Sequence, residues 1–368
     1  MPAGRENMIL LCAGGTGGHL FPAEALAIAL TKRGVAIELA TDRRTMHFDF
    51  PARAVHLVPS ATLTGRDPVA LARTAALLAL GLFKAWVLLG RLSPAAVIGF
   101  GGYPTVPPLI AATLRGIPTL IHEQNSVMGR ANRMLAPRVG RIATGFPSLQ
   151  NVGESLQAKL VFTGNPLRPQ VIVAASVPYA PPAGKFHLLV FGGSQGARVM
   201  AEVVPAAIAG IEADLRRRMT VTQQARPEDL EMVRGAYARL GVDAECAPFF
   251  ADLPARIAAS HLVVARSGAS TVAELAAVGR PAILVPLPHA LDQDQAANAA
   301  VLEEAGGAIR ILQKDFTPER LAAEIVRLGG AAETLARMAA AARSVGMLDA
   351  AERLADVVME IAGRDGTS

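Results

Sequence analysis

The chain has 368 residues, a length sufficient for two domains of ordinary size, each with its own core. Apolar residues make up 51% of it, aromatic residues only 4%, and 34 glycines interrupt runs of Ala, Val and Leu, which favours a parallel α/β protein. The net charge of +5 is small for a nucleic-acid-binding protein, and it suits contact with anionic lipids or phosphates.

The two cysteines, Cys12 and Cys246, both lie in apolar runs. This position is typical of small core residues in a reducing compartment, and it argues against a disulfide or a metal site. Residues 1–7 are polar, and the apolar run that follows them breaks into glycines by residue 14. The sequence therefore does not predict a signal peptide.

The first half of the chain alternates apolar runs with helical patterns. Strands are predicted at 8–13, 36–41, 96–100, 118–122, 140–145 and 160–163. Helices are predicted at 23–33, 69–92, 104–115 and 127–136. Such alternation predicts a doubly wound parallel sheet.

The first strand leads into a glycine turn, Gly14–Gly18, followed by His19. Backbone N–H groups of such a turn can approach an anion, and the helix that follows adds a favourable dipole. A turn that only holds phosphate needs no histidine, whereas one that also moves a proton near neutral pH could use His19. A dinucleotide-binding fingerprint is the alternative, since Asp42 ends the next strand, although Leu20 occupies the position of its third glycine.

The run 75–90 is apolar except for Lys84, and Arg73 and Arg91 flank it. It is shorter than the roughly 20 apolar residues that span a bilayer, and it carries a central charge. One interpretation is a buried helix. The other is a helix that leaves apolar side chains exposed for a membrane surface, with the arginines at headgroup level. The exposed side chains would then be Leu77, Leu80, Phe83, Trp86 and Leu88.

A second glycine turn, Gly99–Pro104, follows a strand of the same half. Two such turns at one sheet edge indicate a ligand with a diphosphate or two phosphates, while the alternative is a tight strand-to-helix connection. The polar run His122–Asn125 ends another strand, and four such side chains suit hydrogen bonds to a polyhydroxyl ligand.

The run Gly164–Pro169 contains a glycine and two prolines, residues that interrupt helices and strands, and it precedes a second series of elements. Residues 173–184 are interpreted as a loop. Strands are predicted at 186–191, 220–225, 245–250, 262–265, 282–286 and 308–312. Helices are predicted at 198–218, 227–240, 269–278, 293–305, 317–328 and 332–362. The two halves resemble each other, so we expect two Rossmann-like domains facing across a ligand-binding cleft. Residues 1–166, completed by 344–368, form one domain and 167–343 the other.

Polar residues of the second half fit an anionic, hydroxylated ligand. Ser194 in a glycine turn and Arg168 in the hinge could bind one phosphate. The helix N-terminus at 268–271 favours a diphosphate, and Glu274 suits a ribose diol, with a capping role as its alternative. The pattern Asp292–Asp294 could hold a divalent ion, but it is short and common, so a metal site is not predicted.

Together these motifs resemble one family, the bacterial UDP-N-acetylglucosamine:N-acetylmuramyl-(pentapeptide) pyrophosphoryl-undecaprenol N-acetylglucosaminyltransferases. The matching motifs, in the family's order, are Gly14–Pro22, Gly101–Tyr103, His122–Asn125, Gly164–Arg168, Gly192–Arg198, Arg266–Glu274 and Gln295–Asn298. The resemblance implies the two-domain glycosyltransferase-B fold. It also implies transfer of GlcNAc, with inversion, from UDP-GlcNAc to the 4-hydroxyl of undecaprenyl-diphosphate-linked MurNAc-pentapeptide, the last lipid-linked step of peptidoglycan precursor synthesis.

The resemblance implies a role for each matching residue. His19 would be the general base, with Glu123 as the alternative. The donor would contact Thr16, Gly17, Gly18 and Asn125 of the first domain, Arg168 of the hinge, and Ser194, Phe250, Ala269, Ser270, Thr271, Glu274 and Gln295 of the second. The acceptor diphosphate would contact Gly15, Gly18, Gly102 and Tyr103. No cofactor or metal is implied, since UDP-GlcNAc is a substrate.

The membrane-facing residues would be Leu77, Leu80, Phe83, Trp86, Arg73 and Arg91. The resemblance implies a peripheral protein on the cytoplasmic face of the inner membrane, with roles in cell shape and division. Its partners would be the two substrates, an anionic membrane surface and other proteins of cell-wall synthesis and division, and no nucleic acid.

Two positions depart from the family pattern. Asp294 stands where some members have a second glutamine, and Phe250 is bulkier than the expected aliphatic residue. Two alternative functions stay open. One is a related sugar-nucleotide enzyme of the same fold, such as a glycolipid glycosyltransferase or a UDP-GlcNAc 2-epimerase. The other is a non-catalytic subunit that binds a nucleotide sugar at the membrane.

Overall fold

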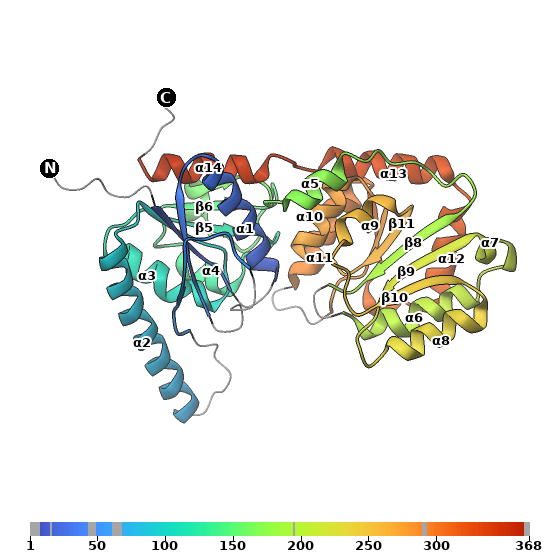
Figure 1. The fold of residues 1–368 in the computed structure, drawn as a ribbon, viewed down its shortest axis with the longest axis horizontal. Coiled ribbons are helices and arrows are strands. Elements are labelled where there is room, and N and C mark those ends of the chain that lie inside the picture. Colours follow the sequence, from blue (N-terminus) through green and yellow to red (C-terminus); the bar gives the residue numbers. More distant parts are fainter. Residues whose placement is uncertain are drawn as a thin grey trace. The chain divides into compact units, whose positions relative to one another are not determined.

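The computed structural model describes residues 8–14, 17–42, 49–60, 68–193, 196–288 and 293–363, with side chains from residue 74 in the helix that begins at 68. The chain divides into two compact units (Figure 1). The first unit contains residues 1–168 and 349–368, and the second contains 169–348. Compared with the expected domains, 167–168 lie in the first unit and 344–348 in the second.

The described part of the first unit is built on a seven-stranded parallel sheet, in the order β3-β2-β1-β4-β5-β6-β7. The strands are β1 (Met8–Cys12), β2 (Ala36–Thr41), β3 (Ala54–Leu57), β4 (Ala96–Gly99), β5 (Thr119–Glu123), β6 (Arg141–Thr144) and β7 (Leu160–Phe162). Every residue of β1, β4 and β5 is buried, because helices cover both faces of a parallel sheet.

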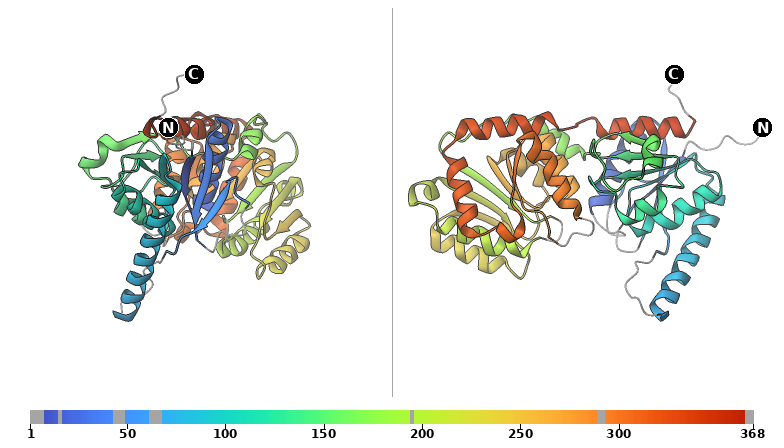
Figure 2. Two further views of the ribbon diagram at one scale, coloured as in Figure 1. Left: turned by 60° about the vertical axis from the view of Figure 1, so that its left-hand side comes forward. Right: turned by 180° about the vertical axis from the view of Figure 1, so that it is seen from behind.

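Helices pack on both faces of this sheet (Figures 1 and 2). They are α1 (Gly17–Lys32), α2 (Pro68–Leu92), α3 (Val106–Leu114), α4 (Arg130–Leu135) and α14 (Ala350–Ile361), with short 3-10 turns η2 (Tyr103–Thr105) and η3 (Glu154–Lys159). Helices α1 and α14 share one apolar core, while α2, α3 and α4 contribute to another.

The last helix, α14, belongs to the first unit although the second unit precedes it in the chain. Leu354 and Val358 are fully buried in the same core as Leu26 of α1. Arg33, just after α1, pairs with Glu352 at 2.8 Å and with Asp356 at 2.6 Å. Apolar burial and a pair of surface ion pairs thus join the C-terminus to α1.

We expect Arg33→Met to lower the free energy of unfolding by no more than about 1 kcal/mol, because exposed ion pairs contribute little. The carboxylate side chains of Glu352 and Asp356 are 50% and 69% exposed, and that of Arg33 is 29% exposed. Urea unfolding at low and high salt measures the loss, which should shrink at high salt. A loss of several kcal/mol that shrinks at high salt would show that the ion pairs, and not the apolar contacts, hold α14.

The described part of the second unit has a six-stranded parallel sheet, in the order β10-β9-β8-β11-β12-β13. The strands are β8 (Phe186–Phe191), β9 (Met219–Gln224), β10 (Asp243–Ala247), β11 (Leu262–Ala265), β12 (Ala282–Leu284) and β13 (Ala308–Arg310). The helices are α5 (Pro169–Ala175), α6 (Arg198–Ala209), α7 (Ala213–Arg218), α8 (Leu230–Leu240), α9 (Leu253–Ala259), α10 (Ala269–Val278), α11 (Asp294–Ala305), α12 (Pro318–Gly329) and α13 (Ala332–Ser344), with a 3-10 turn η5 (Gln313–Asp315).

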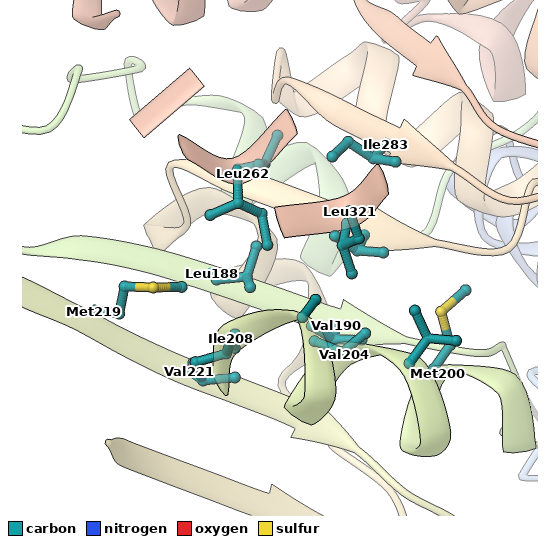
Figure 3. Close-up of a cluster of buried hydrophobic side chains, with 14 of the residues drawn as sticks. Leu188, Val190, Met200, Val204, Ile208, Met219, Val221, Leu262, Ile283 and Leu321 are labelled. Atoms are coloured by element: carbon teal, nitrogen blue, oxygen red, sulfur yellow. The ribbon is translucent and has the colours of Figure 1, made fainter. Parts of the chain in front are cut away.

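The core of the second unit lies between its sheet and the helices α6 and α12. Figure 3 shows Leu188 and Val190 of β8 beside Val204 of α6, with Leu321 of α12 close to them. All four side chains are at most 1% exposed. The apolar strand pattern of the sequence is therefore explained by burial on both sheet faces.

Several predicted elements differ from the observed ones. The predicted helix 198–218 is divided into α6 and α7, because Gly210 ends α6. The predicted helix 332–362 is divided into α13 and α14, which lie in different units. The short elements β3, α5 and α9 were not predicted, and β10 covers 243–247 instead of 245–250.

The difference between prediction and structure that matters most for function is the start of α1. The structure begins this helix at Gly17, six residues before the predicted start at 23, so Gly17, Gly18 and His19 are helical. Leu20 is 4% exposed and packs in the core with the rest of α1, which explains why the helix extends through two glycines. His19 is thus carried by the first helical turn and not by a loop.

The order of the first sheet reverses between β1 and β4, and that of the second between β8 and β11. In open α/β sheets, ligands bind at the carboxyl ends of strands at such a switch point. The glycine turns of the sequence follow these four strands. Each unit therefore has one candidate ligand-binding edge.

Candidate active site

The edge of the first sheet brings His19 against the second glycine turn. A Cβ added at Gly101 or at Gly102 would lie 3.3 Å from the nearest atom of the half-buried His19 ring. Both glycines also have positive φ angles, 86° and 74°. Glycine is required here for two reasons, the backbone conformation and the close approach of the imidazole.

Behind the ring lies a chain of hydrogen bonds from β5. Nδ1 of His19 is 3.2 Å from Oε1 of Gln124. Nε2 of Gln124 lies 3.1 Å from both Nδ1 and the backbone oxygen of His122. Nε2 of His122 in turn lies 3.0 Å from the backbone oxygen of Gly164. We call this arrangement the His19–Gln124–His122 chain.

Glu123 lies beside this chain, and four donors occupy its carboxylate. Oε1 accepts hydrogen bonds from the backbone and side-chain nitrogens of Asn125 at 3.0 and 3.2 Å. Oε2 accepts from the backbone nitrogen of Gly129 at 2.9 Å and from Nδ2 of Asn132 at 2.8 Å. Glu123 is 2% exposed. This geometry suits a residue that shapes the loop after β5, and it favours His19 over Glu123 as the base.

The run His122–Asn125 was expected to present four polar side chains to a polyhydroxyl ligand. This interpretation is wrong for three of them, because His122, Glu123 and Gln124 are at most 2% exposed and bond within the protein. Asn125 is half-buried. Polar residues at the end of a buried strand can support a site from behind, and the sequence gives no signal that separates the two roles.

Burial lowers the pKa of His122 from its usual value of 6.5 to about 4, and the hydrogen bond to the Gly164 carbonyl opposes this shift. The imidazole is therefore neutral at pH 7. Its Nε2 hydrogen is donated to Gly164, which leaves Nδ1 as the acceptor for Gln124.

This lowered pKa predicts a loss of stability in acid. Between pH 6.5 and pH 4 the unfolded chain binds a proton at His122 that the folded chain does not, so the free energy of unfolding falls as the pH is lowered. The loss between pH 7 and pH 5 should be about 2 kcal/mol. Urea unfolding of the wild type and of His122→Gln at both pH values measures it. Equal pH dependence in the two proteins would contradict the assignment.

In the second unit, a buried glutamine supports the first glycine turn. Oε1 of Gln224 accepts from the backbone nitrogen of Gly192 at 3.0 Å. Nε2 of Gln224 donates to the backbone oxygens of Gly193 at 3.0 Å and Pro248 at 3.1 Å. A Cβ at Gly192 would lie 2.3 Å from the backbone nitrogen of Ala197, so this position requires glycine. Gln224 ends β9, and no motif in the sequence marks it as a support of this turn.

The second turn of this unit leads into α10. Gly268 is the N-cap, and Ala269, Ser270 and Thr271 form the first helical turn. The preceding Ser267 donates from Oγ to the backbone oxygen of Gln295 at 2.8 Å, which ties the turn to the start of α11. Backbone N–H groups of a first helical turn favour an anion. Glu274, the predicted ribose ligand, is 7% exposed.

Three other predicted donor-binding residues have contacts within the protein. Oε1 of Gln295 accepts from the backbone nitrogen of Leu287 at 3.1 Å. Phe250 is 7% exposed, and the Arg256 guanidinium lies 4.2 Å from the centre of its ring. Because the ring is covered in this way, a ligand contact through the Phe250 backbone is favoured over one through its side chain. The Arg168 guanidinium lies 4.0 Å from the centre of the Phe21 ring, within the first unit.

Several predicted residues cannot be placed. Gly15, Thr16, Ser194 and Asp292 lie outside the described residues, as does the side chain of Arg73. In the remainder of the chain, no group of three His, Cys, Asp or Glu side chains is arranged to hold a metal ion. Tyr103, predicted to contact the acceptor, is half-buried in η2, directly after Gly102.

Helix α2 leaves one apolar side exposed. Leu80, Phe83, Trp86 and Val87 are 45%, 65%, 39% and 53% exposed, and Leu77 is half-buried. The opposite side is buried, through Thr74, Gly81, Ala85 and Leu89. The interpretation of α2 as a buried helix is therefore wrong for the side that carries Leu80, Phe83 and Val87. Figures 1 and 2 show the N-terminal end of α2 extending beyond the rest of the first unit.

Basic residues accompany this apolar side. Lys84 and Arg91 are exposed, and the Arg115 guanidinium lies 4.1 Å from the centre of the Trp86 ring. By length and composition alone, Thr74–Leu92 could span a membrane. A groove of about 380 Å³ separates α2 from β3, and apolar and basic residues line it. Its lining includes Val55, Leu57, Phe83, Lys84, Val87 and Arg91.

Comparisons with known proteins agree for both units. Residues 9–144 match the glycosyltransferase family 28 N-terminal domain, and residues 187–354 match the C-terminal domain of the same family. The chain is 61% identical over 359 residues to a protein of Rhodopseudomonas palustris, and the match covers 96% of this chain and 98% of that protein. That relative is named UDP-N-acetylglucosamine--N-acetylmuramyl-(pentapeptide) pyrophosphoryl-undecaprenol N-acetylglucosamine transferase.

Two solved structures show the same architecture. The crystal structure of Acinetobacter baumannii MurG has a TM-score of 0.77 and 27% identity, with 96% of this chain and 99% of that chain covered. The UDP-GlcNAc 2-epimerase of Neisseria meningitidis, bound to UDP-GlcNAc, has a TM-score of 0.69 but only 13% identity, with 96% and 100% covered. The likeness to the epimerase concerns the fold alone.

Proposed function

Because the chain belongs to glycosyltransferase family 28, and within it to the UDP-N-acetylglucosamine–N-acetylmuramyl-(pentapeptide) pyrophosphoryl-undecaprenol N-acetylglucosamine transferases, we infer that it transfers GlcNAc from UDP-GlcNAc to lipid-linked MurNAc-pentapeptide. The observation that carries this function is the 61% identity over 96% of the chain. The epimerase alternative has only a shared fold in its support.

We propose that His19 is the general base of this transfer. The acceptor 4-hydroxyl must lose its proton as it attacks the anomeric carbon, and imidazole is suited to take it near neutral pH. His19 is half-buried at the switch point of the first sheet, in the first turn of α1. The occupied carboxylate of Glu123 makes this residue the weaker candidate.

We propose that the second unit binds the donor. The first turn of α10 would stabilise the diphosphate and the negative charge that develops on the leaving UDP, without a cofactor. Phe250, Glu274, Ala269 and Gln295 would contact the uracil, the ribose and the GlcNAc, as the family resemblance implies. The first turn of α1, which contains Gly18, and the turn that contains Gly102 would contact the acceptor diphosphate.

We propose that the exposed side of α2 binds the cytoplasmic surface of an anionic inner membrane, where the lipid-linked acceptor resides. The side chains that would enter the interface are Leu80, Phe83, Trp86 and Val87. Lys84 and Arg91 would lie at headgroup level. Lys84 at the centre of the apolar stretch disfavours a spanning helix, since a charge at the bilayer centre is costly. Contacts with other proteins of cell-wall synthesis and division stay a prediction.

A transfer assay tests the function directly. Radiolabelled UDP-GlcNAc is offered with a MurNAc-bearing lipid diphosphate or with a plain diacylglycerol, and the lipid product is measured. We expect label only in the MurNAc-bearing lipid. Transfer to diacylglycerol would support a glycolipid synthase, and conversion of UDP-GlcNAc to its 2-epimer without acceptor would support an epimerase.

A further inference from the structure

We propose that Gln124 is a positioning residue that holds the neutral His19 ring in the tautomer protonated at Nδ1. This tautomer leaves the lone pair on Nε2, the nitrogen that would take the acceptor proton. The catalytic consequence rests on the proposed role of His19 as the base, whereas the tautomer itself does not.

The orientation of the Gln124 amide follows from its neighbours. One of its two terminal atoms lies 3.1 Å from the backbone oxygen of His122, and a carbonyl oxygen can only accept a hydrogen bond. The atom at that position must therefore be the amide nitrogen. The same nitrogen lies 3.1 Å from Nδ1 of His122, which accepts its second hydrogen because Nε2 of that ring donates to Gly164.

The tautomer of His19 follows from this orientation. With its nitrogen turned toward His122, Gln124 presents Oε1 to Nδ1 of His19 at 3.2 Å. An amide oxygen can only accept, so Nδ1 of His19 carries the hydrogen. Every hydrogen in the His19–Gln124–His122 chain is thus assigned from the backbone carbonyls of Gly164 and His122, which can only accept hydrogen bonds.

Burial makes this arrangement rigid. Gln124 is 2% exposed and His122 is fully buried. The Gln124 backbone oxygen accepts from Nδ2 of Asn165 at 2.9 Å, and the His122 backbone oxygen also accepts from Nδ2 of Asn132 at 3.2 Å. Turning the Gln124 amide over would place its oxygen against two acceptors in a site shielded from solvent, which is strongly unfavourable.

The Gln124 side chain that contacts His19 is an uncharged amide. A charged carboxylate in contact with Nδ1 would favour the protonated imidazolium. A neutral amide selects the tautomer without adding that charge. The His19 imidazole is therefore oriented by a partner that carries no charge.

The first test measures the tautomer in the wild-type protein. Nitrogen-15 NMR distinguishes a protonated from an unprotonated ring nitrogen, and the His19 signals are identified by their loss in His19→Gln. In the full-length wild type at alkaline pH, we expect the protonated type at Nδ1 and the unprotonated type at Nε2. The opposite pattern, or an even mixture, would overturn the proposal.

The second test uses variants. Gln124→Met should remove the preference for one His19 tautomer in the NMR spectrum and lower kcat about 10- to 100-fold, part of the 10²–10⁴-fold that a positioned base contributes, with KM for UDP-GlcNAc unchanged. Gln223→Met is the matched control, since Gln223 is also fully buried and hydrogen-bonded but lies in the second unit. Equal kcat losses in the two variants, or an unaltered His19 tautomer in Gln124→Met, would refute the role of Gln124.

If His19→Ala retains turnover while the NMR tautomer is as expected, the base assignment fails and the positioning of the ring by Gln124 stands.

Discussion

His19→Ala should lower kcat for GlcNAc transfer by about 10²–10⁴-fold, which is the contribution of a positioned general base. Binding of UDP-GlcNAc should be retained, because the donor is proposed to contact chiefly the second unit. The ring is half-buried in the first turn of α1, so its removal leaves the buried Leu20 anchor of that turn intact. Steady-state kinetics and calorimetric titration with UDP-GlcNAc measure the two quantities.

Glu123→Gln is the matched comparison for this prediction. The variant removes the carboxylate that could act as an alternative base, but its amide oxygen can still accept from part of the loop after β5. We expect kcat to stay within about tenfold of the wild type, below the contribution of a base. Turnover that survives in His19→Ala and disappears in Glu123→Gln would reverse the two assignments.

Replacing Leu80, Phe83 and Trp86 together by serine should weaken binding to anionic vesicles about 100-fold. Full burial of one such side chain contributes roughly 1.5–3 kcal/mol. The three side chains are 39–65% exposed, so about half of that value is available to each in the interface. Co-sedimentation with vesicles of phosphatidylglycerol and phosphatidylcholine measures the partition of wild type and variant.

A second triple variant controls for the loss of exposed apolar surface as such. Met232, Leu312 and Val326 of the second unit are 50%, 43% and 47% exposed, and their replacement by serine should leave vesicle binding unchanged. High salt should release the wild type, because Lys84 and Arg91 contribute by charge attraction. Equal weakening by the two triple variants, or binding that resists salt and alkaline extraction, would contradict a surface-bound α2.

A single motif in the sequence can have two different roles in the folded protein. The polar run at the end of β5 has the same sequence signature whether it contacts a ligand or supports a histidine from behind. Only the burial of His122 and Gln124 and the orientation of their hydrogen bonds separate the two possibilities. Gln224, which performs a comparable supporting role in the second unit, had no signal in the sequence because it ends an ordinary strand.

The sequence by itself determined the fold class and both sets of glycine turns, because apolar strand runs and glycines are local patterns that a parallel sheet imposes along the chain. It also identified His19 and the apolar stretch of α2. Tertiary structure decided the rest. Core packing of Leu20 draws His19 into a helix, and packing of α14 on α1 returns the C-terminus to the first unit. Which side of α2 is exposed, and which side chain faces Nδ1 of His19, depends on contacts between residues far apart in sequence, which local patterns do not encode.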